Sequence, residues 1–140
     1  MIVVDASVAV RWYAEDAWTD LANGLLTPEK PLSAPDLIVP ELSNALWKLA
    51  RAGIIADGQA ADALARIPSV VSLVPTANLG ARAFAIARTL NHPTYDCFYL
   101  ALAEAAESPL VTLDRRLFSR TRGTPWADLT TLLGDDSVLT

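Results

Sequence analysis

Short, wholly apolar runs alternate along the chain with longer segments of helical periodicity. We expect strands at residues 2–4, 32–34, 70–74 and 110–113. Because the apolar positions in these runs are continuous rather than alternating, each strand should be covered on both faces, as in a parallel sheet. Strands separated by helices imply right-handed crossovers. The pattern therefore predicts an α/β fold, a three-layer α/β/α sandwich with a central parallel sheet.

The segments between the strands carry the helical signals. Leu42, Leu46 and Leu49 recur at helical spacing, and Gly53 is a residue favoured just past a helix end. Asp57 can cap the helix that follows. We expect helices over residues 7–13, 18–26, 42–53, 57–67, 77–90 and 95–107.

Composition limits the class of protein. A chain of 140 residues with 52% apolar residues fits one domain, residues 1–140, and excludes the disordered class. The single cysteine, Cys97, permits no intramolecular disulfide and no thiolate-rich zinc site, which fits a reducing cytoplasm. The longest uncharged run, residues 67–81, contains two prolines and is too short to span a bilayer, so we expect a cytoplasmic protein without membrane contact.

Four acidic residues stand where folding alone gives them no purpose. Asp5 and Asp114 directly follow apolar strands, Asp96 interrupts an apolar run, and Glu41 opens a helix. Asp5 and Asp114 should meet beyond the carboxyl ends of parallel strands, where ligands bind in such sheets. Glu41 and Asp96 could instead merely complement a helix dipole, but Asp96 shares its helix face with apolar residues. Because crowded, buried carboxylates are costly, the set predicts a divalent metal site.

The remaining charges leave two readings open. The net charge of −5 argues against a polyanionic partner, but without the four acids it would be −5 + 4 = −1. A basic group follows Asp114 and forms either a rim for an RNA backbone or a solvated helix face: Arg115, Arg116, Arg120 and Arg122. His92 is the only histidine, so a catalytic pair of imidazoles is impossible. Because it precedes Pro93, we expect His92 in a surface loop.

Four segments, read together, resemble the PIN-domain ribonucleases, and most closely the VapC-type toxins of bacterial and archaeal toxin–antitoxin pairs. They are residues 4–7 (VDAS), 40–46 (PELSNAL), 95–103 (YDCFYLALA) and 111–117 (VTLDRRL). The resemblance covers essentially the whole chain, in order and at a length typical of the family.

The resemblance implies a role for each matching residue. Asp5, Glu41, Asp96 and Asp114 correspond to the acidic quartet that holds Mg²⁺ or Mn²⁺ and catalyses the reaction. Ser7 and Thr112 correspond to supporting positions, although a helix cap for Ser7 and a plain strand residue for Thr112 are equally compatible with the sequence. Arg115 and Arg116 are the candidate RNA-binding residues.

The implied activity is metal-dependent endonucleolytic cleavage of structured RNA, such as transfer RNA or ribosomal RNA loops, leaving 5′ phosphate and 3′ hydroxyl ends. The implied partners are the RNA substrate and a cognate antitoxin protein. We also expect a homodimer, because large apolar residues such as Trp12, Trp47 and Leu49 exceed what a monomer of this size needs to bury.

Other functions remain possible from the sequence. A PIN-fold module that binds RNA without cleaving it would carry the same motifs. A phosphoaccepting receiver domain needs a lysine after a late strand, whereas the only lysines here are Lys30 and Lys48. A phosphatase of the aspartyl-phosphate type needs a second acid two residues beyond Asp5, where Ser7 stands.

Overall fold

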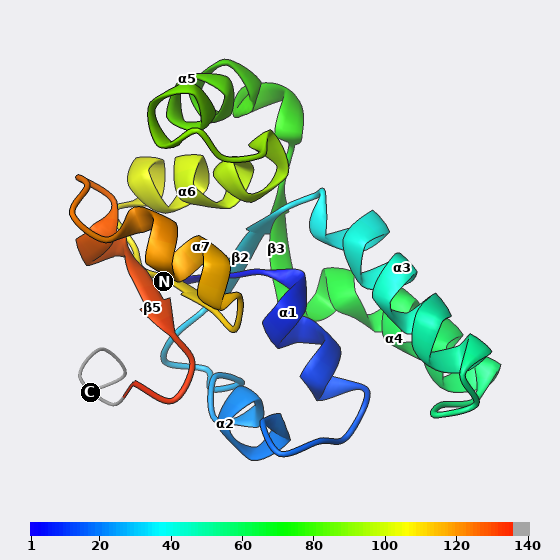
Figure 1. Ribbon diagram of the computed structural model, residues 1–140. Coiled ribbons are helices and arrows are strands. Elements are labelled where there is room, and N and C mark those ends of the chain that lie inside the picture. Colours follow the sequence, from blue (N-terminus) through cyan, green and yellow to red (C-terminus); the bar gives the residue numbers. More distant parts are fainter. Residues whose placement is uncertain (136–140) are drawn as a thin grey trace.

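The central feature of the protein is a parallel sheet. The computed structural model, which describes residues 1–135, contains a sheet with the strand order β3-β2-β1-β4-β5, and every strand pairing is parallel (Figure 1). The strands are β1 (Ile2–Val4), β2 (Leu32–Pro35), β3 (Val71–Val74), β4 (Leu110–Thr112) and β5 (Thr130–Leu132). The predicted parallel sheet is confirmed.

The strand order reverses at β1, the middle strand: β2 and β3 lie on one side of it, and β4 and β5 lie on the other. From β1 the chain passes to β2 on one side, and β4 pairs with the other side of β1, so that Val3 is paired with both Ser33 and Leu110. Such a switch point leaves a crevice at the carboxyl ends of the two diverging strands. Asp5 follows β1 and Asp114 comes shortly after β4, so the topology brings both residues to this crevice.

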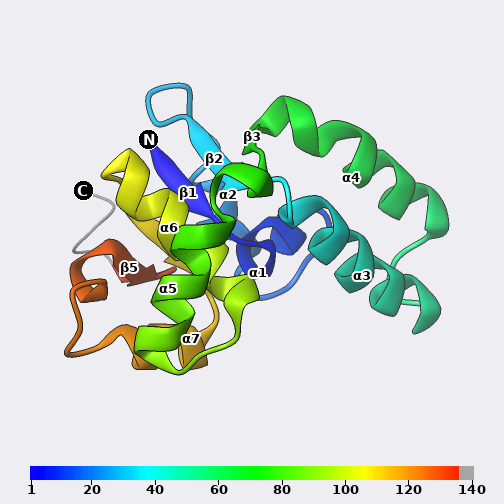
Figure 2. The ribbon, with the colours of Figure 1, turned by 90° about the horizontal axis from the view of Figure 1, so that it is seen from above.

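Helices cover both faces of the sheet. The α-helices are α1 (Ala6–Ala9), α2 (Thr19–Asn23), α3 (Ile38–Arg51), α4 (Asp57–Val70), α5 (Gly80–Leu90), α6 (Thr94–Ala106) and α7 (Arg115–Thr121). Short 3₁₀ segments are η1 (Val10–Trp12), η2 (Thr76–Asn78) and η3 (Ala127–Leu129). Helix α6 packs on β1, β2 and β4 and is itself covered by α5, while α1 and α2 lie on the opposite side (Figures 1 and 2). This is the predicted three-layer arrangement.

Helix α6 is the most buried helix of the fold. Its central residues are buried on nearly every side, as the nearly continuous apolar sequence requires, and they include Cys97, Tyr99 and Leu100. Burial raises the pKa of the Cys97 thiol to about 11, so this cysteine stays a neutral core residue at physiological pH. The helix can therefore hold Asp96 and Tyr99 in fixed positions near its amino end.

The structure differs from the sequence prediction in several places. The edge strand β5 was not predicted, because Thr130 and Thr131 break the apolar run that marks the other strands. The helix expected from residue 77 is divided into η2 and α5, and Ala56 rather than Asp57 is the amino-terminal cap of α4. There, the Gln59 side chain accepts a hydrogen bond from the Ala56 backbone N–H at 2.9 Å.

None of the helices within residues 1–135 combines the length and the apolar character needed to cross a membrane.

Candidate active site

Asp5 occupies the centre of the crevice between β1 and β4. Its side chain caps α1, accepting a hydrogen bond from the Val8 backbone N–H at 3.3 Å. The Ser7 hydroxyl donates to the same oxygen, Oδ1, at 2.5 Å, and the Thr112 hydroxyl donates to Oδ2. Burial raises the pKa of Asp5 to about 6, although these hydrogen bonds act in the opposite direction. Asp5 is thus a fixed carboxylate whose negative charge is poorly compensated.

Ser7 and Thr112 join the chain after β1 to the chain after β4. The Leu113 backbone N–H donates to Ser7 Oγ at 2.9 Å, and the Asp114 backbone N–H donates to Thr112 Oγ1 at 3.0 Å. Their two hydroxyl oxygens lie 3.4 Å apart. Asp5, not Ser7, caps the helix, so both hydroxyls act on the position of the Asp5 carboxylate.

Glu41 is held by a tyrosine that the sequence analysis did not identify. Tyr99 is 1% exposed, and its hydroxyl donates to Glu41 Oε1 at 2.5 Å. Burial raises the pKa of Glu41, and burial together with the negative charges of Glu41, Asp5 and Asp96 raises the pKa of Tyr99. Tyr99 is consequently a permanent hydrogen-bond donor. The sequence did contain a signal for this role, because Tyr99 lies three residues beyond Asp96 and therefore on the same face of the helix.

Asp96 is electrostatically coupled to both of these acids. Its negative charge contributes to the raised pKa values of Asp5 and Glu41. Since such coupling requires proximity, the structure brings Asp5, Glu41 and Asp96 into one cluster, which we call the acidic cluster. It draws together the chain after β1, the first turns of α3 and the first turn of α6.

His92 lies behind Asp96, and the prediction that it is a surface residue was wrong. The residue is 6% exposed, and its Nε2 lies 2.6 Å from Asp96 Oδ2. Asn91 adopts a left-handed conformation (φ 50°) and ends α5, and it is exposed like Pro93, whereas His92 between them is buried. The His92 backbone N–H donates to the Ala87 carbonyl at 3.2 Å. His92 is therefore buried although both of its neighbours in the turn are at the surface.

Asp114 stands apart from the other three acids. Its side chain caps α7, accepting hydrogen bonds from the backbone N–H groups of Arg116 at 3.0 Å and Leu117 at 3.1 Å. No side-chain contact among residues 1–135 joins it to the acidic cluster. The link is indirect, through its own backbone N–H and Thr112.

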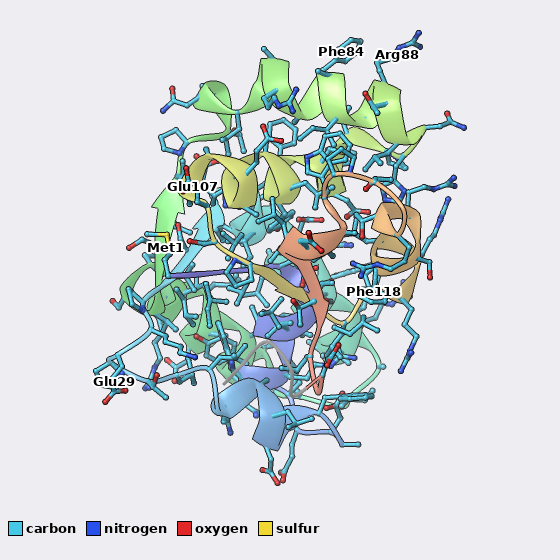
Figure 3. The ribbon with its side chains drawn as sticks, turned by 90° about the vertical axis from the view of Figure 1, so that its left-hand side faces the viewer. Met1, Glu29, Phe84, Arg88, Glu107 and Phe118 are labelled. Carbon is cyan, nitrogen blue, oxygen red and sulfur yellow. The ribbon has the colours of Figure 1, made fainter. Side chains whose placement is uncertain are left out.

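The arginines after Asp114 fall into two groups. Arg115 and Arg116 are exposed on the first turn of α7, and Arg116 and Arg120 line a surface hollow of about 380 Å³. Arg122 is different, because its guanidinium donates to the carbonyls of Ala127 at 2.7 Å and Thr130 at 3.0 Å. It also covers the ring of Phe118, which Figure 3 labels, at 3.8 Å. Arg122 thus holds the carboxyl-terminal part of the fold.

The donor chemistry of the acidic cluster fits a hard divalent cation. Within residues 1–135, no group of three or more His, Cys, Asp or Glu side chains is arranged so that it could hold a metal ion. The side chains that converge are nevertheless oxygen donors, and the pKa values of Asp5 and Glu41 are raised. Mg²⁺ and Mn²⁺ prefer such ligands, and Mg²⁺ keeps several waters instead of requiring a closed cage. A cation would also compensate the charge that the protein leaves uncompensated.

Two curated relatives match most of the chain. Ribonuclease VapC3 of Pyrobaculum aerophilum is 32% identical over 83% of this chain and 91% of its own length. Ribonuclease VapC9 of Mycobacterium tuberculosis is 37% identical over 84% of this chain and 88% of its own length.

Solved structures agree with these matches. PAE2754 of Pyrobaculum aerophilum is 30% identical, with a TM-score of 0.66 over 88% of this chain and 81% of that chain. Two others share the fold at lower identity. VapC20 of Mycobacterium tuberculosis, a sarcin–ricin loop cleaving toxin, is 19% identical, with a TM-score of 0.63 over 80% of this chain and 87% of that chain. VapBC2 of Rickettsia felis, bound to a DNA fragment from its promoter, is 16% identical, with a TM-score of 0.65 over 94% and 98%.

The family model described as PIN domain matches residues 2–123, a range that contains all four candidate acids. The family match, the identities and the shared fold agree over most of the chain. The chain belongs to the PIN-domain family, as a VapC-type ribonuclease.

Proposed function

We propose that Asp5, Glu41, Asp96 and Asp114 bind Mg²⁺ or Mn²⁺ and catalyse phosphodiester hydrolysis in structured RNA. The observation that carries this proposal is the acidic cluster, in which Asp5, Glu41 and Asp96 are electrostatically coupled at the carboxyl end of the sheet. PIN-domain ribonucleases generally depend on divalent metal ions. A bound cation supplies Lewis acidity, which makes water a better nucleophile and stabilises negative charge on the phosphate.

The protein's own residues would prepare the site for this reaction. Ser7 and Thr112 hold both oxygens of Asp5 in place, and Tyr99 does the same for one oxygen of Glu41. Because the Tyr99 pKa is raised, its hydroxyl keeps its proton and stays a donor to Oε1. Ligands that are already oriented lose little entropy when the cation and the scissile phosphate bind.

Arg115 and Arg116 are the proposed contacts to the RNA backbone. Both are exposed and directly follow Asp114, so they would place positive charge beside that residue, near the carboxyl end of β4. Such contacts bind phosphates without reading sequence. We take structured translation RNA, a transfer RNA loop or a ribosomal RNA loop, as the substrate class, since the structural relative VapC20 is described as cleaving the sarcin–ricin loop.

A cognate antitoxin is the proposed inhibitor of the nuclease. The structural relative VapBC2 supports such a pairing. A hollow of about 520 Å³ beside the acidic cluster, lined by Glu41, Lys48, Leu49 and Ile54 among others, could accept an antitoxin segment. A cationic side chain of that segment, placed against Asp5 and Asp96, would displace the metal and block the path of the RNA.

We also propose that the chain, residues 1–140, acts as one domain in a cytoplasmic homodimer. Trp47 is 53% exposed, and the guanidinium of Arg51 lies over its ring at 4.6 Å. Trp12, in contrast, is partly buried within the chain and donates its indole N–H to the Ala22 carbonyl at 2.8 Å. Trp47 is therefore the better candidate for a contact between subunits.

Cleavage of structured RNA by the purified protein tests the proposal. Transfer RNA and a ribosomal RNA loop should be cut in the presence of Mg²⁺ or Mn²⁺, giving 5′ phosphate ends, and a chelator should stop the reaction. Equal cleavage under chelation would overturn the metal-dependent mechanism. Co-expression with the neighbouring reading frame should relieve growth arrest and yield one complex, and harmless expression of an active nuclease would overturn the toxin role.

A further inference from the structure

The contact between His92 and Asp96 takes no part in the proposed hydrolysis of RNA. The side chain of His92 is 2% exposed, whereas that of Asp96 is 29% exposed, so the histidine lies on the protein side of the carboxylate. A carboxylate that binds a cation is ionised and can only accept hydrogen bonds, so in that state the matching tautomer carries the proton on His92 Nε2 and donates it to Oδ2. Within residues 1–135, no hydrogen bond involves the other oxygen, Oδ1.

Folding stability does not account for a histidine at this position. The other ring nitrogen, Nδ1, is buried and is the one buried side-chain nitrogen or oxygen without a hydrogen-bond partner in the described part of the chain. An unsatisfied buried polar atom destabilises a fold, and an apolar side chain of similar size would avoid that cost. The backbone at His92 is nevertheless fixed, because Asn91 turns the chain and the His92 N–H donates to the Ala87 carbonyl.

We propose that His92 is a positioning residue that fixes the Asp96 carboxylate for cation binding. The Nε2–H bond fixes the rotation of the carboxylate and leaves Oδ1 as the oxygen available to the cation. Groups that orient a metal ligand in this way affect metal affinity without touching the metal. The inference rests on the proposed function, since it assumes that Asp96 is a metal ligand.

Metal affinity of the metal-free protein is the direct test, measured by calorimetric titration with Mn²⁺. His92→Leu removes the donor and should weaken Mn²⁺ binding by about 10-fold to 100-fold. His92→Gln, whose amide can donate from a similar position, should recover most of the affinity. Leu90→Ala is the matched control, because it removes a buried side chain at the end of α5 and leaves the His92–Asp96 contact in place. Its Mn²⁺ affinity should equal that of the wild type.

A double-variant cycle separates positioning from general packing. In an Asp96→Asn background, His92→Leu should cause no further loss of Mn²⁺ affinity. An undiminished loss in that background, an equal loss in Leu90→Ala, or wild-type affinity in His92→Leu would each overturn the inference. Failure of the wild-type protein to bind Mn²⁺ would instead overturn the proposed metal site itself.

A measurement on the wild-type protein avoids any dependence on variant folding. His92 is the only histidine of the chain, so an untagged protein gives a single set of imidazole nitrogen resonances. Saturation with Mg²⁺ should shift the Nε2 resonance, because the cation polarises the carboxylate that accepts its hydrogen bond. An unchanged Nε2 resonance at saturation would overturn the inference.

Discussion

The two ends of α6 use carboxylates in opposite ways. Near its carboxyl end, Glu104 accepts two hydrogen bonds from Arg82, at 2.6 and 2.9 Å, and one from the buried Trp126 indole at 2.8 Å. These contacts lower the pKa of Glu104, chiefly through Arg82. Near its amino end, Asp96 lies close to Asp5 and Glu41, and its charge raises their pKa values. The Glu104 end is a completed ion pair that ties three elements together, whereas the Asp96 end still lacks positive charge.

The contrast separates a carboxylate that stabilises the fold from carboxylates whose charge is left for a ligand to compensate. An ion pair with complete partners needs nothing from outside the protein, so we assign the Glu104 end to stability. The acidic cluster is buried, fixed and only partly compensated, so its favourable state includes a cation. This difference can be tested at the Glu104 end, in the acidic cluster and at the arginines that follow Asp114.

The largest expected effect is on catalysis. Asp96→Asn should lower RNA cleavage by at least about a hundredfold, because the charge that binds the cation is lost from the site. Glu104→Gln, the same chemical change on the same helix, should leave the rate within about twofold, since Glu104 lies outside the acidic cluster. Single-turnover cleavage of a labelled RNA measures both. Equal losses in the two variants would remove the distinction between the two ends.

The second prediction concerns pH and the stability of the metal-free protein. The pKa of Asp5 is about 6 in the fold against an ordinary value of 3.8, so its acid form favours folding. That contribution is fully present below pH 3.8 and is lost as the pH rises through about 6. At pH 8, Asp5→Asn should therefore be more stable than the wild type by about 2 kcal/mol, a value that allows for weakened hydrogen bonds.

Urea unfolding in the presence of a chelator, from pH 3.5 to pH 8, measures this difference. The gap between Asp5→Asn and the wild type should close at the acidic end of the range. A variant that is less stable than the wild type at every pH would show that Asp5 serves the fold instead of a ligand.

The third prediction concerns Glu104, near the carboxyl end of α6, where the opposite change in stability is expected. Glu104→Gln should destabilise the protein by about 1 kcal/mol, because the half-exposed ion pair with Arg82 is lost while the amide can still accept from Trp126. Thermal unfolding at pH 7 gives the value. Unchanged stability would mean that Arg82 and Glu104 are no more than a solvent-screened surface pair.

The smallest expected effect is on RNA binding. Replacing Arg115 and Arg116 together by alanine should weaken binding and reduce the slope of log affinity against log salt by about 1 to 1.5. Mn²⁺ affinity should stay nearly unchanged. Arg66→Ala on α4, which removes an exposed charge elsewhere, is the control and should leave the salt slope as it is. A slope that does not move in the double variant would return both arginines to the solvated helix face.

Sequence patterns predicted the parts of the site that depend on topology. Asp5 and Asp114 could be placed because a carboxylate directly after an apolar strand lies at a known edge of a parallel sheet. The contacts of Tyr99 with Glu41 and of His92 with Asp96 were harder to predict, because they depend on how α6 lies against α3 and α5. His92 was assigned to the surface from its neighbour Pro93 alone, although its spacing of four residues from Asp96 was visible in the sequence.

The basic segment shows a second limit. Arg122 belongs to the same basic segment as Arg115 and Arg116 and was expected on a solvated helix face, yet its guanidinium donates to backbone carbonyls that come later in the chain. Such long-range contacts leave no periodic signal, and the strand they support, β5, is too polar to be recognised by hydrophobicity. The sequence therefore predicted that this segment is positively charged, but it did not predict the contacts of Arg122 or the strand β5.

The contacts of Arg122 also bear on where the chain can be shortened. The PIN-domain match ends at residue 123, but β5 lies beyond it and pairs with β4 through Leu110, Val111 and Thr112. A chain ended at Gly123 would keep Arg122 and lose its carbonyl partners, and β4 would become an edge strand with open hydrogen-bonding groups. Exposed apolar edges pair with one another between molecules. A fragment limited to the family match would therefore aggregate, and the smallest unit that stays dispersed must extend through β5.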